Sequence, residues 1–92
     1  MNHAEARKKD CLEALKELRI NTDPIQWTYI QAIDDVMELI KQSSASPLRV
    51  AEQYTRQMHG KLETAYAKLN PLTATIFQDK AAMGTVIVNM FQ

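Results

Sequence analysis

The sequence predicts an all-α protein, a small up-and-down bundle of three to four helices that forms one domain over residues 1–92. Apolar residues recur three and four positions apart along most of the chain, which is the spacing of one face of a helix. Three prolines each follow a residue that caps helices well, at Asp23-Pro24, Ser46-Pro47 and Asn70-Pro71, and proline is favoured at the first position of a helix. With two Gly and three Pro, the chain has few turns, which disfavours a β-sandwich.

The first two helices are expected over about 3–20 and 24–42, joined by a short connection of the kind that links antiparallel helices. The apolar stripe of the first is Cys11, Leu12, Leu15 and Leu18. That of the second is Tyr29, Ile30, Ile33, Val36, Met37 and Ile40. Gln26 follows Asp23 by three positions, which predicts a capping box at the start of the second helix.

The third helix is expected over about 47–69, because a heptad pattern persists there for three repeats. The pattern consists of Leu48, Ala51, Thr55, Met58, Leu62, Ala65 and Leu69. Gly60 interrupts it, and glycine inside a helix costs about 1 kcal/mol relative to alanine. Gly60 therefore predicts a break, a kink or a close approach to another helix.

The fourth helix is expected over about 71–83, with Leu72, Ile76 and Met83 facing inward and Gly84 as a C-terminal cap. Residues 85–92 form an apolar tail, and its β-branched residues favour a strand by propensity. A lone strand has no partner in an all-helical chain. We therefore expect the helix to continue through the tail, the alternative being a strand that pairs with another molecule.

Charge is balanced over the whole chain but not along it. Eleven basic and eleven acidic residues cancel, so the overall charge does not favour a nucleic-acid partner. Residues 21–46 carry one Lys against three Asp and one Glu, whereas residues 47–70 carry four basic and two acidic residues. We expect the second and third helices to attract each other.

No apolar run of about 18 residues exists, so we expect no membrane insertion. No apolar stretch follows the basic start of the chain either, which argues against a secretory signal and favours a cytoplasmic location. The single Cys excludes an internal disulfide framework and most zinc sites. We expect Cys11 to be a reduced thiol.

Three groups of residues are candidates for chemistry, and each has a simpler interpretation. His59 with Glu63 suits a solvent-exposed pair better than a metal site. Asp34 with Glu38 suits a solvated acidic face, and Cys11 falls on an apolar stripe. We therefore expect no catalytic, cofactor-binding or metal-binding residue.

Two resemblances carry limited information. In length and helicity the chain is similar to the all-helical chorismate mutases, but no motif matches Arg7, Arg19, Arg49 or Arg56 to their arginines. About fifteen residues near the end resemble the ends of needle subunits of bacterial injection-type secretion systems. The residues concerned are Phe77, Asp79, Lys80, Ile87, Asn89 and Phe91. That family has one helical hairpin, whereas three helices that begin with Pro are expected here, so the resemblance does not assign the chain to it.

The function that the sequence favours is non-enzymatic protein binding through helix packing, as an adaptor, inhibitor or chaperone-like subunit. The partner would be another protein or a second copy, in a homodimer. A chain of this length buries only part of its apolar surface, and large exposed apolar patches usually mark interfaces. The expected interface residues are Trp27, Tyr66, Val86, Ile87, Val88, Met90 and Phe91. The alternatives are a small helical enzyme with a site between helices and a nucleic-acid-binding regulator.

Overall fold

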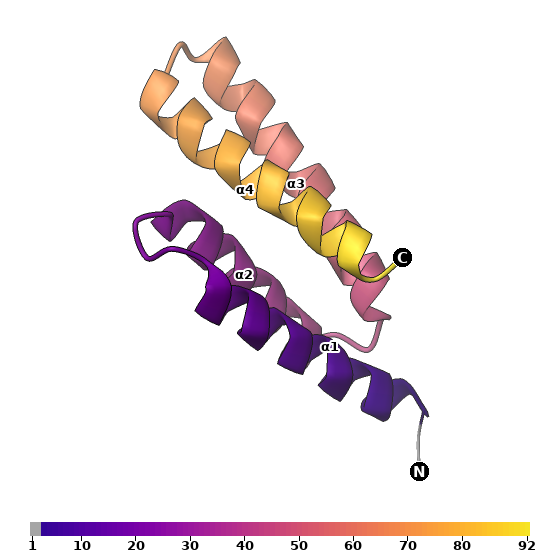
Figure 1. Ribbon diagram of the computed structural model, residues 1–92. Helices are drawn as coiled ribbons and strands as arrows, with labels where there is room; N and C mark the ends of the chain where they lie inside the picture. The colour runs from indigo at the N-terminus through magenta and orange to yellow at the C-terminus, as the bar shows by residue number, and fades with distance from the viewer. Residues whose placement is uncertain (1–2) are drawn as a thin grey trace.

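The computed structural model describes residues 3–92, which form four helices and no strand. The helices are α1 (His3–Asn21), α2 (Trp27–Gln42), α3 (Pro47–Ala67) and α4 (Pro71–Met90). Figure 1 shows them running alternately up and down as two helical hairpins, α1–α2 and α3–α4, which pack against each other. The predicted all-α bundle is confirmed, with four helices.

Two of the three predicted helix starts have the expected caps. The Ser46 hydroxyl accepts a hydrogen bond from the backbone N–H of Arg49 at 3.3 Å, and the Asn70 side-chain carbonyl accepts one from Thr73 at 3.1 Å. Pro47 and Pro71 are the first residues of α3 and α4. The side chains therefore satisfy backbone N–H groups that have no partner within the helix.

The third predicted start, at Asp23-Pro24, is wrong. The Asp23 carboxylate accepts a hydrogen bond from the N–H of Ile25 at 3.0 Å, and its backbone carbonyl accepts one from Gln26 at 2.8 Å. These bonds close a turn of the kind that Asp stabilises through its side chain. The chain therefore turns at Asp23 instead of starting a helix, and α2 begins only at Trp27, after a Gln26 that makes no side-chain capping bond.

The C-terminal segment continues as helix through Gly84 to Met90, so the expected continuation is confirmed and the expected end at residue 83 is wrong. Helical geometry carries Ile87 into the core, where its side chain is fully buried. Burial of such a side chain contributes about 2 kcal/mol. Tertiary packing therefore outweighs the strand propensity of the β-branched tail.

The core is centred on α2. Its buried side chains are Thr28, Ala32, Ile33, Val36, Met37 and Ile40, which face α1 on one side and the α3–α4 hairpin on the other. By contrast, α1 buries only Leu15 completely. Lys8 on α1 donates to the backbone carbonyls of Lys41 and Ser43, where a cation is favourable at the C-terminal end of α2.

Polar contacts tie α2 to the second hairpin as well. The Thr28 hydroxyl donates to Asp79 at 2.9 Å, and Asp35 accepts from the Tyr54 hydroxyl at 3.2 Å and from Lys80 at 3.5 Å. Burial and the nearby Asp35 carboxylate raise the pKa of Tyr54, so its hydroxyl remains a donor. The ion pairs of α2 within residues 3–92 run to α1, through Arg19 and Asp34, and to α4, through Lys80 and Asp35. The expected attraction between α2 and α3 stays a prediction.

The glycine that marks a close helix approach is Gly84, not Gly60. A Cβ atom on Gly84 would lie 2.6 Å from the Thr55 hydroxyl oxygen, whereas one on Gly60 would meet nothing within 4 Å. Gly60 lies inside an unbroken α3. The α3–α4 contact is tight because small side chains line it, including Ala51, Ala65, Ala74 and Ala81.

The two hairpins are offset along their common axis. The molecule is 50 Å long, whereas its longest helix, α3, has 21 residues and spans about 31 Å. Thr28, in the first turn of α2, lies against Asp79 of α4, which is eight residues after the start of that helix. The turn between α3 and α4 therefore projects about 12 Å, or two helical turns, beyond the start of α2 (Figure 1).

Candidate functional site

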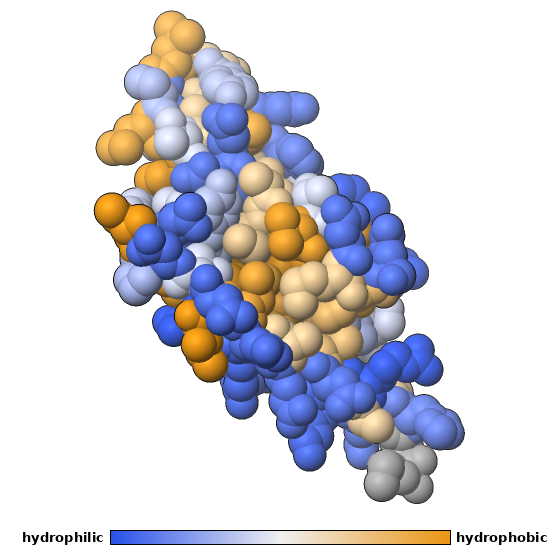
Figure 2. Space-filling model, viewed as in Figure 1, coloured by the Kyte–Doolittle hydropathy of each residue, from blue (hydrophilic) through white to orange (hydrophobic). Residues whose placement is uncertain are grey.

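The six most exposed large apolar side chains of residues 3–92 all lie at the two turns within the hairpins, which are at the same end of the bundle. Ile20, Ile25 and Trp27 surround the α1–α2 turn, and Tyr66, Leu69 and Leu72 surround the α3–α4 turn. We call these six residues the apolar end. Figure 2 shows apolar side chains at the projecting tip of the hairpin and a second group in the middle of the same face. Isolated exposed apolar residues are common, but a group of large ones is typical of an interaction surface.

Leu69 is the most unusual member of the apolar end. It is 87% exposed and has a φ of +55°, a left-handed conformation that costs a non-glycine residue about 1–2 kcal/mol. The N–H groups of Leu69 and Asn70 bond to the carbonyls of Tyr66 and Ala65, each at 3.0 Å, which is the Schellman pattern that usually places glycine here. The turn thus presents a strained leucine to solvent, and α3 ends at Ala67 rather than at the expected residue 69.

An open groove runs along one side of the projecting hairpin. It has a volume of about 570 Å³ and lies between the end of α3 and the start of α4. We call it the distal groove. Its lining residues are Gln57, Gly60, Lys61, Thr64, Ala65, Lys68, Asn70, Thr73 and Phe77.

The distal groove is electropositive with an apolar floor. Lys61 and Lys68 line it, and no carboxylate does. The Lys61 ammonium lies 5.4 Å from the centre of the Phe77 ring, close enough for a cation–π contact that orients the side chain. The arrangement can hold an apolar ligand that carries negative charge at its edges.

A second groove, of about 450 Å³, lies on the other side of the same hairpin. Tyr66, Leu69, Pro71 and Ala74 line it with neutral polar side chains, and it contains no charged residue. The projecting part of the hairpin therefore offers two faces of different chemistry, one basic and one neutral.

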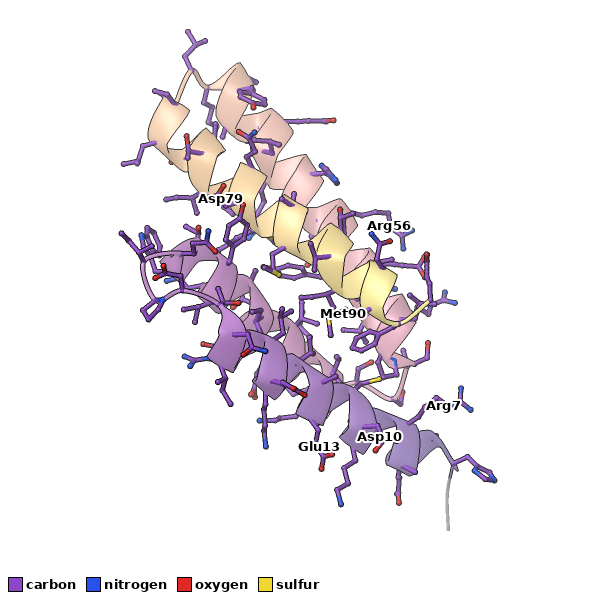
Figure 3. The ribbon with its side chains drawn as sticks, viewed as in Figure 1. Arg7, Asp10, Glu13, Arg56, Asp79 and Met90 are labelled. Atoms are coloured by element: carbon purple, nitrogen blue, oxygen red, sulfur yellow. The ribbon has the colours of Figure 1, made fainter. Side chains whose placement is uncertain are left out.

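The interface residues expected from the sequence divide into three groups. Trp27 and Tyr66 are more than half exposed and belong to the apolar end. Val86 and Met90 are partly exposed on the C-terminal half of α4, and Figure 3 shows Met90 on the side of α4 that faces the α1–α2 hairpin. Val88 and Phe91 are half-buried against the core. Ile87 is fully buried, so its side chain cannot contact a partner of the folded chain, and its assignment to the interface is corrected.

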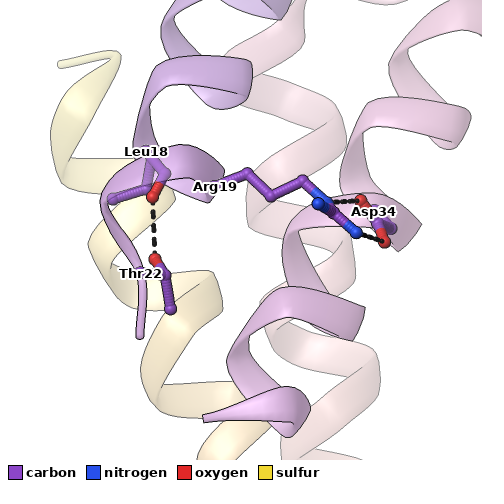
Figure 4. Close-up of polar contacts among 4 residues, drawn as sticks. All are labelled: Leu18, Arg19, Thr22 and Asp34. Carbon is purple, nitrogen blue, oxygen red and sulfur yellow. Dashed lines mark hydrogen bonds and ion pairs between the residues drawn. The ribbon is translucent and has the colours of Figure 1, made fainter. Parts of the chain in front are cut away.

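The other candidate residues have structural partners or are exposed. Arg19 holds the Asp34 carboxylate through two nitrogens, at 2.8 and 3.3 Å (Figure 4), whereas Glu38 accepts from Gln42. The two carboxylates thus do not form a joint site. Cys11 is half-buried, and burial together with Asp10 raises its thiol pKa, which disfavours the reactive thiolate. His59 is exposed on α3.

Two further kinds of site are absent from residues 3–92. Groups of three or more His, Cys, Asp or Glu side chains that could hold a metal ion are not found there. Likewise, none of the four helices combines the length and the apolar character needed to cross a membrane.

Sequence reasoning missed most of this site. It placed Leu69 in the heptad pattern and Leu72 on the inward face, yet the two are 87% and 74% exposed because no helix of the described chain covers the projecting hairpin. Lys61, Lys68 and Phe77 were not recognised as one group. The expected third helix, 47–69, is longer than the expected second helix, 24–42. This difference was the available signal that part of the third helix would project uncovered.

Comparisons of the chain with models of protein families, with curated proteins and with solved structures find no match.

Proposed function

We propose that this protein is a non-enzymatic protein-binding module that docks its partner at the apolar end. The observation that carries the proposal is that the six most exposed large apolar side chains of residues 3–92 all lie at the two turns at one end of the described molecule. Water contact with these side chains is unfavourable, and covering them would contribute roughly 25 cal/mol per Å² of apolar surface. The partner is either another protein or a second copy of the chain.

The strained turn supports the same proposal. A glycine at position 69 would relieve the left-handed conformation, yet the chain places there a leucine that buries almost nothing within the molecule. Strain of this kind is characteristic of functional sites. An exposed leucine on a hydrogen-bonded turn is a suitable anchor, because its backbone is already ordered before it enters a partner.

Site-specific photo-crosslinking tests the proposal. A photoreactive phenylalanine analogue is introduced singly at Leu69, at Ile25 and, as a matched control, at Lys9, which is exposed on α1 about three helical turns before Ile20. We expect protein adducts from positions 69 and 25 in the cells that express the variants, and little adduct from position 9. Mass spectrometry identifies the adducts and separates a second copy of the chain from another protein.

Equal adduct yields at all three positions would contradict docking at the apolar end. Circular dichroism of each variant shows that the bundle remains folded, so that exposure of the core does not create the adducts.

A further inference from the structure

The distal groove is the unfilled continuation of the groove that holds α2. On α3, Val50, Tyr54 and Gln57 border α2, as shown by the Tyr54–Asp35 hydrogen bond and the shallow pocket that these residues share with Leu39. The next members of the same helical row, four, three and four residues further on, are Lys61, Thr64 and Lys68. These three residues line the distal groove.

The same continuity exists on α4. Asp79 and Lys80 contact α2 through Thr28 and Asp35. Phe77 and Thr73, respectively three and seven residues before Lys80, line the distal groove. A surface formed by two antiparallel helices that accepts α2 at one end is thus open for about two turns beyond it.

We infer that the distal groove binds an acidic amphipathic helix of a partner protein, seated in line with α2 on the α3–α4 hairpin. This inference rests on the proposed protein-binding function and names the chemistry of the partner. A groove between two helices accepts a third helix through apolar residues spaced three and four apart. Phe77, Ala65 and the bare backbone of Gly60 provide the apolar floor.

Charge determines which helix fits. Lys61 and Lys68 lie on the α3 side of the groove and no carboxylate lines it, so glutamate or aspartate on the flank of an incoming helix would find a partner. A second copy of the basic α3 segment would be repelled, and two lysines are too few for a nucleic-acid footprint.

The test uses the full chain and a synthetic peptide. The peptide is an acetylated 14-residue helix former with leucines three and four positions apart and glutamates on both flanks, and its matched control carries lysine in place of every glutamate. Binding is followed by nuclear magnetic resonance of the labelled protein. We expect the glutamate peptide to shift the amide signals of Gly60, Lys61, Lys68, Thr73 and Phe77, and the lysine peptide to leave them unchanged.

Two protein variants localise the effect. The double variant K61E/K68E is expected to lose affinity for the glutamate peptide by about tenfold or more and to gain affinity for the lysine peptide. The control variant K9E/K16E makes the same charge change on α1 and is expected to alter the affinity by less than about twofold. Gly60→Phe fills the groove from a position where a Cβ meets nothing within 4 Å, so it should abolish peptide binding while the bundle remains folded.

Four results would overturn the inference. Equal binding of both peptides, or peptide binding that K61E/K68E does not weaken, would show that the groove does not select acidic helices. Tighter binding of a single-stranded oligonucleotide, with a steep dependence on salt, would identify nucleic acid as the ligand. If position 69 gives adducts in cells but the glutamate peptide does not bind, the proposed protein-binding function stands. Only the assignment of an acidic helix as the partner is then rejected.

Discussion

At the scale of single residues, Leu69 combines an unfavourable backbone conformation with little compensating burial. Its φ of +55° is unfavourable for leucine, and its side chain gains little from packing because it is 87% exposed. We expect Leu69→Gly to raise the free energy of unfolding by about 1 kcal/mol, since glycine adopts this conformation without strain and only part of the gain is offset by its greater freedom in the unfolded chain. Urea denaturation measures the change.

The control for this variant is Leu72→Ala. Leu72 is also an exposed leucine, 74% accessible, but it lies within α4. This substitution should change the stability by less than about 0.5 kcal/mol. A Leu69→Gly protein that is no more stable than the parent would show that the turn does not strain the leucine.

At the scale of helices, the two glycines should respond to alanine in opposite directions. Gly60→Ala is expected to stabilise the protein by about 1 kcal/mol, because alanine favours the helix and its methyl group enters open space. Gly84→Ala is expected to destabilise it by about 1–3 kcal/mol, because the new Cβ would lie 2.6 Å from the Thr55 hydroxyl oxygen. Thr55 cannot turn away freely, since this hydroxyl donates to the carbonyl of Ala51 at 2.9 Å. Thermal and urea denaturation compare the two.

A second substitution identifies the cause. Thr55→Ala removes the hydroxyl, so Gly84→Ala should be markedly less harmful in the Thr55→Ala background than in the parent chain. Additive effects of the two substitutions would mean that the oxygen contact is not what Gly84 avoids.

At the scale of the whole molecule, α1 is the least firmly attached helix. It buries only Leu15 completely, and its Arg19–Asp34 ion pair is half exposed, so water screens most of that attraction. We expect native-state hydrogen exchange to show that the amides of α1 exchange through an opening of lower free energy than those around Ile33 and Ile87. Equal protection in all four helices would show instead that the bundle opens as a single unit.

The sequence was sufficient for the fold class because periodicity and capping are local properties. Ser46 and Asn70 cap their helices as their positions before proline predict. The same pattern at Asp23 produced a turn, in which its carbonyl accepts from Gln26, three residues on, whereas the carbonyls of Ser46 and Asn70 accept from the residue four positions on. Sequence alone does not distinguish these outcomes. Which glycine marks a close approach depends on the crossing of α3 and α4, which is a property of three dimensions.

Less of the candidate site could be predicted. Trp27 and Tyr66, which were expected at an interface, are exposed at the apolar end, and their contact with a partner stays a prediction. Ile87 was misassigned, because strand propensity made the tail resemble a separate element. The distal groove depends on the offset between the two hairpins, and it becomes visible only when Thr28 is seen to lie beside Asp79.

The offset also bears on the order in which the chain acquires its structure. The α3–α4 hairpin is made of contacts between neighbouring segments, whereas the Thr28–Asp79 hydrogen bond joins residues 51 positions apart. Local contacts form at a lower entropic cost than distant ones, so we expect the hairpin to assemble before α2 docks on it. The surface of the α3–α4 hairpin would then bind α2 during folding and the partner helix afterwards.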